Sequence, residues 1–200
     1  MKVVSLFSGG GGLDVAAKLA GCDVICAVDN DADSVQTLKA NNPNSSAVYV
    51  LGDLSVLTGD EIRTSCSLKR DEAFLLVGGP PCQSFSKNNY WTKSGKESQR
   101  RKKVRRSKAL QSGNDYLGSV ELPRLKDRVD VDRDPRTSLV MEYARLIREV
   151  QPTAFLFENV ASIRHPKNRI YLEEFKNACE NAGYFLNEFL LSSEAYGVAQ

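Results

Sequence analysis

The sequence predicts an α/β fold in which a doubly wound, mostly parallel sheet carries helices on both faces. Two observations support this prediction. Short apolar stretches alternate with helical patterns up to residue 77, and the same alternation returns after residue 137. In addition, a glycine-rich turn follows the first apolar stretch directly. A chain of 200 residues has the length of one domain, or of one domain and a fragment.

The first part of the chain is expected to contribute four strands and two helices. Each expected helix is followed by turn residues, either Gly21 or the pair Asn42-Pro43. The expected strands are Lys2–Ser8, Val24–Val28, Ala47–Leu51 and Phe74–Val77, and the expected helices are Leu13–Ala20 and Ala32–Asn41.

Residues 87–136 interrupt this alternation and are expected to form a long loop or insertion. Apolar residues then recur with helical spacing up to Val150, so we expect a helix that Thr137 or Ser138 caps and that ends before Pro152. The remaining expected elements are a strand at Ala154–Phe157, a helix at Tyr171–Ala182 that Gly183 ends, and a sixth strand at Tyr184–Ser192.

Composition excludes several classes of protein. Hydrophobic residues make up 42% of the chain and no apolar run approaches the roughly 20 residues that cross a bilayer. The start of the chain lacks the apolar stretch of a signal peptide, so we expect an intracellular protein that is not secreted, cytoplasmic if prokaryotic. Five cysteines without metal-ligand spacing, and a single histidine, argue against disulfides, metal sites and a Ser-His-Asp triad.

A dense basic block lies within the expected loop. Residues 93–108 hold nine lysines and arginines and only one acidic residue, although the whole chain has a net charge of only +2. Such a block attracts nucleic acid, but it is equally typical of a solvated loop without a partner. Its basic residues are Lys93, Lys96, Arg100, Arg101, Lys102, Lys103, Arg105, Arg106 and Lys108.

The glycine run Gly9–Gly12 joins the first expected strand to the first expected helix. Glycines allow a tight turn and a close approach of a ligand to the positive end of a helix. Asp29 and Asp53 follow the second and third strands, where carboxylates can bind a ribose and an adenine. Asp14 stands where a dinucleotide site would have its third glycine, so we favour an adenosine-containing cofactor without a pyrophosphate.

Two further motifs follow expected strands. Pro80-Pro81-Cys82-Gln83 follows the fourth strand, where a thiol can serve as a nucleophile. Glu158-Asn159-Val160 follows the fifth strand, which we expect beside the fourth, so that Glu158 would face Cys82 and donate a proton. Taken alone, each side chain could instead be structural.

Together these motifs resemble the N-terminal catalytic part of a DNA (cytosine-5)-methyltransferase. The matching segments are Phe7–Gly12, Pro80–Gln83, Glu158–Val160 and Tyr196–Gln200, in the order and at the spacing of that family. The resemblance implies the Rossmann-like fold of methyltransferases that use S-adenosylmethionine. It covers the chain except for about residues 90–133, where the loop is longer than compact members of the family have.

The resemblance also implies roles for individual residues. Cys82 would attack carbon 6 of a flipped cytosine and Glu158 would act at its N3, while Pro81 and Asn159 would position the turn. S-adenosyl-L-methionine would be bound by Phe7, Ser8, Gly9, Gly11, Gly12, Leu13, Asp29, Asn30, Asp53, Leu54 and Pro80. Double-stranded DNA would be contacted by Gln83, Ser84, Ser86 and Arg136. The basic block lies outside the resemblance, but its charge would add phosphate contacts at Arg100, Arg101, Lys102 and Lys103.

The resemblance stops at Gln200, before the family's target recognition domain and last motifs. The catalytic sheet would then be incomplete at its C-terminal end, in a split enzyme completed by a second polypeptide, a truncated gene or an engineered fragment. Other functions stay open: a tRNA cytosine-5-methyltransferase, a non-catalytic remnant that only binds cofactor or DNA, and a nicotinamide- or flavin-dependent oxidoreductase, which the missing third glycine disfavours.

Overall fold

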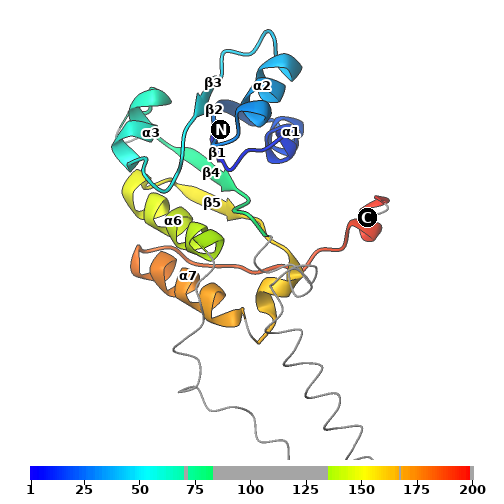
Figure 1. Ribbon diagram of the computed structural model, residues 1–200, viewed down its shortest axis with the longest axis vertical. Helices are drawn as coiled ribbons and strands as arrows, with labels where there is room; N and C mark the ends of the chain where they lie inside the picture. Colours follow the sequence, from blue (N-terminus) through cyan, green and yellow to red (C-terminus); the bar gives the residue numbers. More distant parts are fainter. Residues whose placement is uncertain (70–71, 83–134, 167, 199–200) are drawn as a thin grey trace, which may run out of the picture.

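A five-stranded parallel sheet forms the centre of the molecule (Figure 1). The computed structural model describes residues 1–69, 72–82, 135–166 and 168–198. The strands lie in the order β3-β2-β1-β4-β5, and every neighbouring pair is parallel, which confirms the predicted fold class. They are β1 (Lys2–Leu6), β2 (Asp23–Asp29), β3 (Val48–Leu51), β4 (Phe74–Gly78) and β5 (Ala154–Phe157).

Helices cover both faces of this sheet. In the described part of the chain they are α1 (Gly12–Leu19), α2 (Ala32–Asn41), α3 (Gly59–Ser65), α6 (Pro135–Val150) and α7 (Arg169–Asn181), with 3-10 turns at Ala161–Arg164 and Ser193–Tyr196. Figure 1 shows α6 and α7 stacked on one another, with α1 and α2 on the other side of the strands. The expected helices at 13–20, 32–41 and 171–182 are therefore confirmed within two residues at each end.

Alternate side chains of the strands point to opposite faces, and in the central strands β1, β2 and β4 both faces are buried. Val4, Leu6 and Leu76 pack with α3, α6 and α7 in the larger core. Val3, Val24 and Val77 pack with Ala17 of α1 in a smaller one. Strands buried on both faces explain why their sequences are continuous apolar runs rather than alternating ones.

Two helix starts differ from the sequence-based expectation. The prediction that Thr137 or Ser138 caps α6 was wrong, because the helix already begins at Pro135. Proline suits the first turn of a helix, where its missing N–H would have no partner in any case. Helix α3 was not predicted, although Thr58 and Glu61 form a capping box at its start. Its seven residues are too few to show a periodic pattern.

The predicted sixth strand at 184–192 was also wrong. The segment after α7 is extended, but among the described residues it pairs with no strand. Tyr184 remains anchored, because its hydroxyl donates to the carbonyl of Pro152 at 2.7 Å. Beyond it, Phe185 is 99% exposed and Phe189 is 79% exposed. We call residues 185–191 the exposed segment.

The expectation that the cysteines form no disulfide was wrong as well. Cys26 on β2 and Cys66 at the end of α3 are joined by a disulfide in the larger core, with their Cα atoms 5.4 Å apart. The spacing of the cysteines could not reveal this pair, because it depends on α3, which was not predicted. Cys22, Cys82 and Cys179 are free.

Within the described ranges, no helix combines the length and the apolar character needed to cross a membrane. No group of three or more metal-ligating side chains gathers in these ranges either.

Candidate active site

The candidate site lies where the order of the strands reverses. The chain passes from β1 to β2 and β3 in one direction, and then returns to add β4 and β5 on the other side of β1. Ligands of open α/β sheets bind outside the carboxyl ends of the strands at such a reversal. The turns that leave β1 and β4 here are the glycine run and the Pro-Pro-Cys turn, so the fold brings together the two motifs that the sequence singled out.

The glycine turn adopts a backbone that most residues avoid. Gly9 has a φ of 51° and Gly11 a φ of 89°. Gly11 also caps α1, and a Cβ on it would lie 2.7 Å from a methyl carbon of Leu38. At Gly9, Gly10 and Gly12, by contrast, a Cβ would meet nothing within 4 Å. One side of the turn is therefore packed, and the other is open for a ligand.

Two neighbouring side chains fix this turn. The Asp29 carboxylate accepts hydrogen bonds from the backbone N–H of Gly9 (2.8 Å) and of Asp31 (2.9 Å). Ser8 is buried, and its hydroxyl lies within 3.3 Å of the Val28 carbonyl and 3.0 Å of the Ser5 hydroxyl. Ser8 thus fixes the buried side of the turn. Asp29 remains half-exposed, and its oxygens retain lone pairs for the hydroxyls of a ribose.

The turn after β3 supplies another carboxylate at the same edge. Asp53 is exposed, and its Oδ1 accepts hydrogen bonds from the Ser55 backbone (2.9 Å) and the Ser55 hydroxyl (2.8 Å). These bonds lower the pKa of Asp53, because they favour its charged form. Leu54 is only 3% exposed and anchors the turn in the larger core.

The Pro-Pro-Cys turn and the Glu-Asn motif meet at the ends of two paired strands. Gly78 of β4 pairs with Phe157 of β5, and the next backbone N–H, that of Glu158, donates to the Gly78 carbonyl at 2.9 Å. A Cβ on Gly79 would lie 3.0 Å from Oε2 of Glu158, so the carboxylate rests directly against this turn.

Asn159 links the two motifs by a second hydrogen bond. Its Nδ2 donates to the Pro80 carbonyl at 3.1 Å, and its Oδ1 accepts from the backbone N–H of Val160 at 2.9 Å. Pro80 is buried, while Pro81 and Cys82 are half-buried. The thiol of Cys82 is therefore free and within reach of solvent, on a turn whose backbone is tied to the Glu158 motif.

Tyr143 of α6 supports both strands from beneath the site. Its ring is fully buried, and its hydroxyl lies 2.9 Å from the Leu156 carbonyl of β5 and 3.3 Å from the Leu76 carbonyl of β4. Desolvation raises the pKa of Tyr143 well above the ordinary value, so the hydroxyl stays protonated. The sequence analysis did not identify this role, because the helical spacing of apolar residues up to Val150 marks a core face without showing what a hydroxyl on it contacts.

The burial of Asp14 is a second feature that the sequence did not reveal, because Asp14 was noted there only in place of a third glycine. It is 4% exposed in the first turn of α1, and its carboxylate oxygens have no partner at good hydrogen-bond geometry, although the Ser5 hydroxyl is close enough to favour the charged form. Burial raises the pKa of Asp14, and the nearby Ser5 and Lys18 offset part of this rise. An acid buried beneath a glycine turn is destabilising when it is charged.

The structure brings together most of the predicted cofactor and catalytic residues. Phe7, Gly9–Gly12, Leu13, Asp29, Asn30, Asp53, Leu54, Pro80, Pro81, Cys82, Glu158 and Asn159 all lie on turns at the carboxyl edge of the sheet or next to them. The predicted DNA contacts at Gln83, Ser84, Ser86, Arg100, Arg101, Lys102 and Lys103 lie outside the described residues. Arg136 lies in the first turn of α6.

Comparison with known proteins identifies a family for this arrangement. A model of the C-5 cytosine-specific DNA methylase family matches residues 1–104 and 130–200. Similar proteins include the Type II methyltransferases M.SacI of Streptomyces achromogenes, which is 27% identical over the whole chain, and M.AquIA of Picosynechococcus, which is 29% identical over the whole chain. The chain spans 45% of M.SacI and 67% of M.AquIA.

Solved structures agree with this result. A crystal structure from an E. coli prophage, described as a DNA modification methyltransferase, has a TM-score of 0.59 and 27% identity over 90% of this chain and 38% of its own. A DNMT2 structure from Spodoptera frugiperda, at 20% identity and a TM-score of 0.51 over 90% of this chain and 41% of its own, supports the fold alone. The family match covers most of the chain, so this protein belongs to the C-5 cytosine-specific DNA methylase family.

Proposed function

We propose that the chain carries the catalytic centre of a DNA cytosine-5 methyltransferase. The observation that supports this most strongly is the pairing of β4 with β5, which ties the Cys82 turn to the Glu158 motif through two hydrogen bonds. A nucleophile and a proton donor on one rigid edge are what attack on a cytosine ring requires.

The residues at the edge of the sheet fit S-adenosylmethionine as the cofactor. The open side of the glycine turn would receive it, with Asp29 at the ribose and Asp53 at the adenine edge. The half-buried Phe7 would supply an apolar contact, whereas the side chain of Leu54 faces the core and would only hold the turn in place. When bound, S-adenosylmethionine supplies the electrophilic methyl group that carbon 5 of cytosine accepts.

The side chains of this protein would perform the remaining chemistry. The Cys82 thiolate would form a bond to carbon 6 of a cytosine that has left the base stack. Glu158 would share a proton with N3 and so draw the displaced electrons away from the ring, which makes carbon 5 nucleophilic. After methyl transfer, a base or water would take the proton from carbon 5, the sulfur–carbon bond would break to release the Cys82 thiolate, and the proton at N3 would return to Glu158.

A trapping experiment tests this function. The chain is incubated with S-adenosylmethionine and duplex DNA that contains 5-fluorocytosine, because fluorine cannot leave as a proton does and the adduct accumulates. We expect a covalent band on a denaturing gel that disappears in Cys82→Ser and persists in Cys22→Ser, which alters another free cysteine. An adduct that survives Cys82→Ser would disprove the assignment of the nucleophile.

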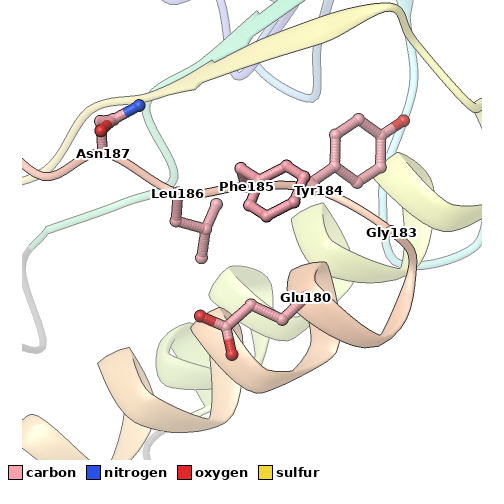
Figure 2. Close-up of a pocket in the computed structure, with 6 residues that line it drawn as sticks. All are labelled: Glu180, Gly183, Tyr184, Phe185, Leu186 and Asn187. Atoms are coloured by element: carbon pink, nitrogen blue, oxygen red, sulfur yellow. The ribbon is translucent and has the colours of Figure 1, made fainter.

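We further propose that a protein segment beyond these 200 residues, whichever polypeptide carries it, completes the sheet and supplies target recognition. The chain spans less than half of M.SacI, which supports a missing part of this kind. The outer edge of β5 and the exposed segment lie next to a cavity of about 490 Å³, lined by Glu180, Gly183, Tyr184, Phe185, Leu186 and Asn187 (Figure 2).

One residue that lines this cavity, Tyr184, lies near the start of β5, the end away from the catalytic turn. Tyr184 is bonded to Pro152, just before β5 begins, whereas Glu158 follows its end. A partner that binds here would leave the catalytic edge free for DNA. If trapping fails with the chain alone, adding the remaining part of a related methylase should restore the adduct. If no adduct forms either with the chain alone or after the remaining part of a related methylase is added, the catalytic proposal is wrong.

A further inference from the structure

The turn between β3 and α3 is held from outside by one arginine. Within the turn, the Asp53 carbonyl accepts hydrogen bonds from the backbone N–H groups of Val56 and Leu57, each at 3.1 Å. The carbonyls of Leu54 and Leu57 instead accept from Nη2 of Arg145 on α6, at 2.8 Å and 3.0 Å. A single guanidinium nitrogen therefore joins the two halves of this turn.

Arg145 is itself held rigidly. Its Nε donates to Glu142 at 2.6 Å and its Nη1 donates to Glu149 at 2.9 Å, so all three of its nitrogens are engaged. Partial burial disfavours the charge of Arg145, but the two carboxylates outweigh this effect and raise its pKa. The planar guanidinium can make these bonds at once, whereas a lysine ammonium could not reach all the acceptors.

Glu149 extends the same network to the start of α3. Its Oε2 accepts from the backbone N–H of Gly59 at 2.8 Å. A Cβ on Gly59 would lie 2.5 Å from the Cβ of Glu149, so only glycine lets α3 approach α6 this closely. The turn is thus clamped to α6 at three points, at Leu54, Leu57 and Gly59.

We propose that Arg145 is a positioning residue that holds residues 53–59 in the conformation that binds the adenosine end of the cofactor. This inference rests on the proposed use of S-adenosylmethionine. Asp53 and Leu54 stand on the turn that Arg145 clamps, so a loose turn would have to become ordered each time adenosine binds. That ordering weakens binding without any loss of direct contact.

Calorimetric titration of the chain with S-adenosylhomocysteine and with 5′-methylthioadenosine tests this role. We expect Arg145→Met to bind both ligands about tenfold more weakly, because both carry the adenosine that the turn would contact. The matched control is Arg148→Met, which removes the same charge from an exposed site on the same helix. It should bind both ligands like the wild type.

The measurement is made at about 15 °C, near the usual temperature of maximum stability, where a moderate loss of stability leaves the protein folded and its affinity unchanged. Arg145→Lys serves as a second variant if Arg145→Met does not fold. It keeps the charge but lacks the planar group, and its affinity should also fall below that of Arg148→Met.

Two results would overturn the inference in different ways. If the wild type binds both ligands, and the folded Arg145 variants bind them as tightly as Arg148→Met, the positioning role is wrong and the cofactor proposal stands. If the wild type binds neither ligand, the proposed cofactor fails and the role of Arg145 fails with it.

Discussion

The carboxyl edge of the sheet and the exposed segment differ in how their residues are packed. At the edge, each motif is tied to a neighbour: Glu158 to Gly78, Asn159 to Pro80, and Gly9 to Asp29. In the exposed segment, Phe185 and Phe189 project into solvent. Among the described residues, the turns at the carboxyl edge are therefore fixed by hydrogen bonds to their neighbours, whereas the outer flank presents large apolar side chains to solvent.

The largest expected effect concerns catalysis at the edge. Glu158→Gln should slow adduct formation with 5-fluorocytosine DNA by about 10²- to 10⁴-fold, the usual range for removal of a general acid. Its side chain is exposed, so the melting temperature should hardly change. Glu194→Gln, also exposed, is the control and should react at the normal rate. Equal rates for the two variants would remove Glu158 from the mechanism.

A smaller effect is expected from the Tyr143 hydroxyl, which contacts β4 and β5 beneath the carboxyl edge. Tyr143→Phe keeps the buried ring but deletes the hydroxyl that contacts both strands, and should reduce the free energy of unfolding by about 1–2 kcal/mol. Tyr196→Phe, at a residue that is 70% exposed, should cost almost nothing. Urea denaturation of the two variants measures the difference. Equal midpoints would show that the Tyr143 hydroxyl does not stabilise the edge.

Asp14 offers a way to strengthen the edge. Because burial raises its pKa in the folded state, its charged form destabilises the fold at neutral pH; this penalty fades as the pH falls from the raised folded pKa to the unfolded pKa, and it is absent below that. Asp14→Asn should therefore stabilise the protein by about 1 kcal/mol at pH 7 and lose that advantage near pH 3. Denaturant curves at both pH values test this. An advantage that does not depend on pH would contradict it.

The smallest effect on stability is expected in the exposed segment. Replacing Phe185 and Phe189 with serine removes side chains that bury little area, so the free energy of unfolding should change by less than about 0.5 kcal/mol. Self-association should nevertheless decrease, which sedimentation can measure. A large loss of stability would mean that these rings are already covered, and the comparison drawn above would then fail.

Local patterns were sufficient to predict much of the fold and the candidate site. The strands are continuous apolar runs that end in turn residues, so their carboxyl ends, and with them the glycine turn, Cys82 and Glu158, could be located in advance. What could not be predicted depends on contacts between distant residues. Arg145 meets the carbonyl of Leu54 across 91 positions, and nothing in either segment alone reveals that bond.

The predicted strand at 184–192 failed for a related reason. Its residues have suitable composition, but a strand exists only with a partner, and the described part of the chain offers none beside it. Helix α3 was not predicted because its seven residues are too few to show a helical period. The Cys26–Cys66 disulfide was not predicted either, because Cys66 is positioned by α3.

The parallel strand order also constrains how the protein is made. Strand β1 lies in the middle of the sheet, where Lys2 pairs with Asp23 on one side and with Phe74 on the other. During synthesis, β1 emerges first and keeps one open edge until β4 has left the ribosome. Closure of such distant pairs is slow, so the nascent chain passes through a period in which a half-built apolar sheet is accessible to chaperones.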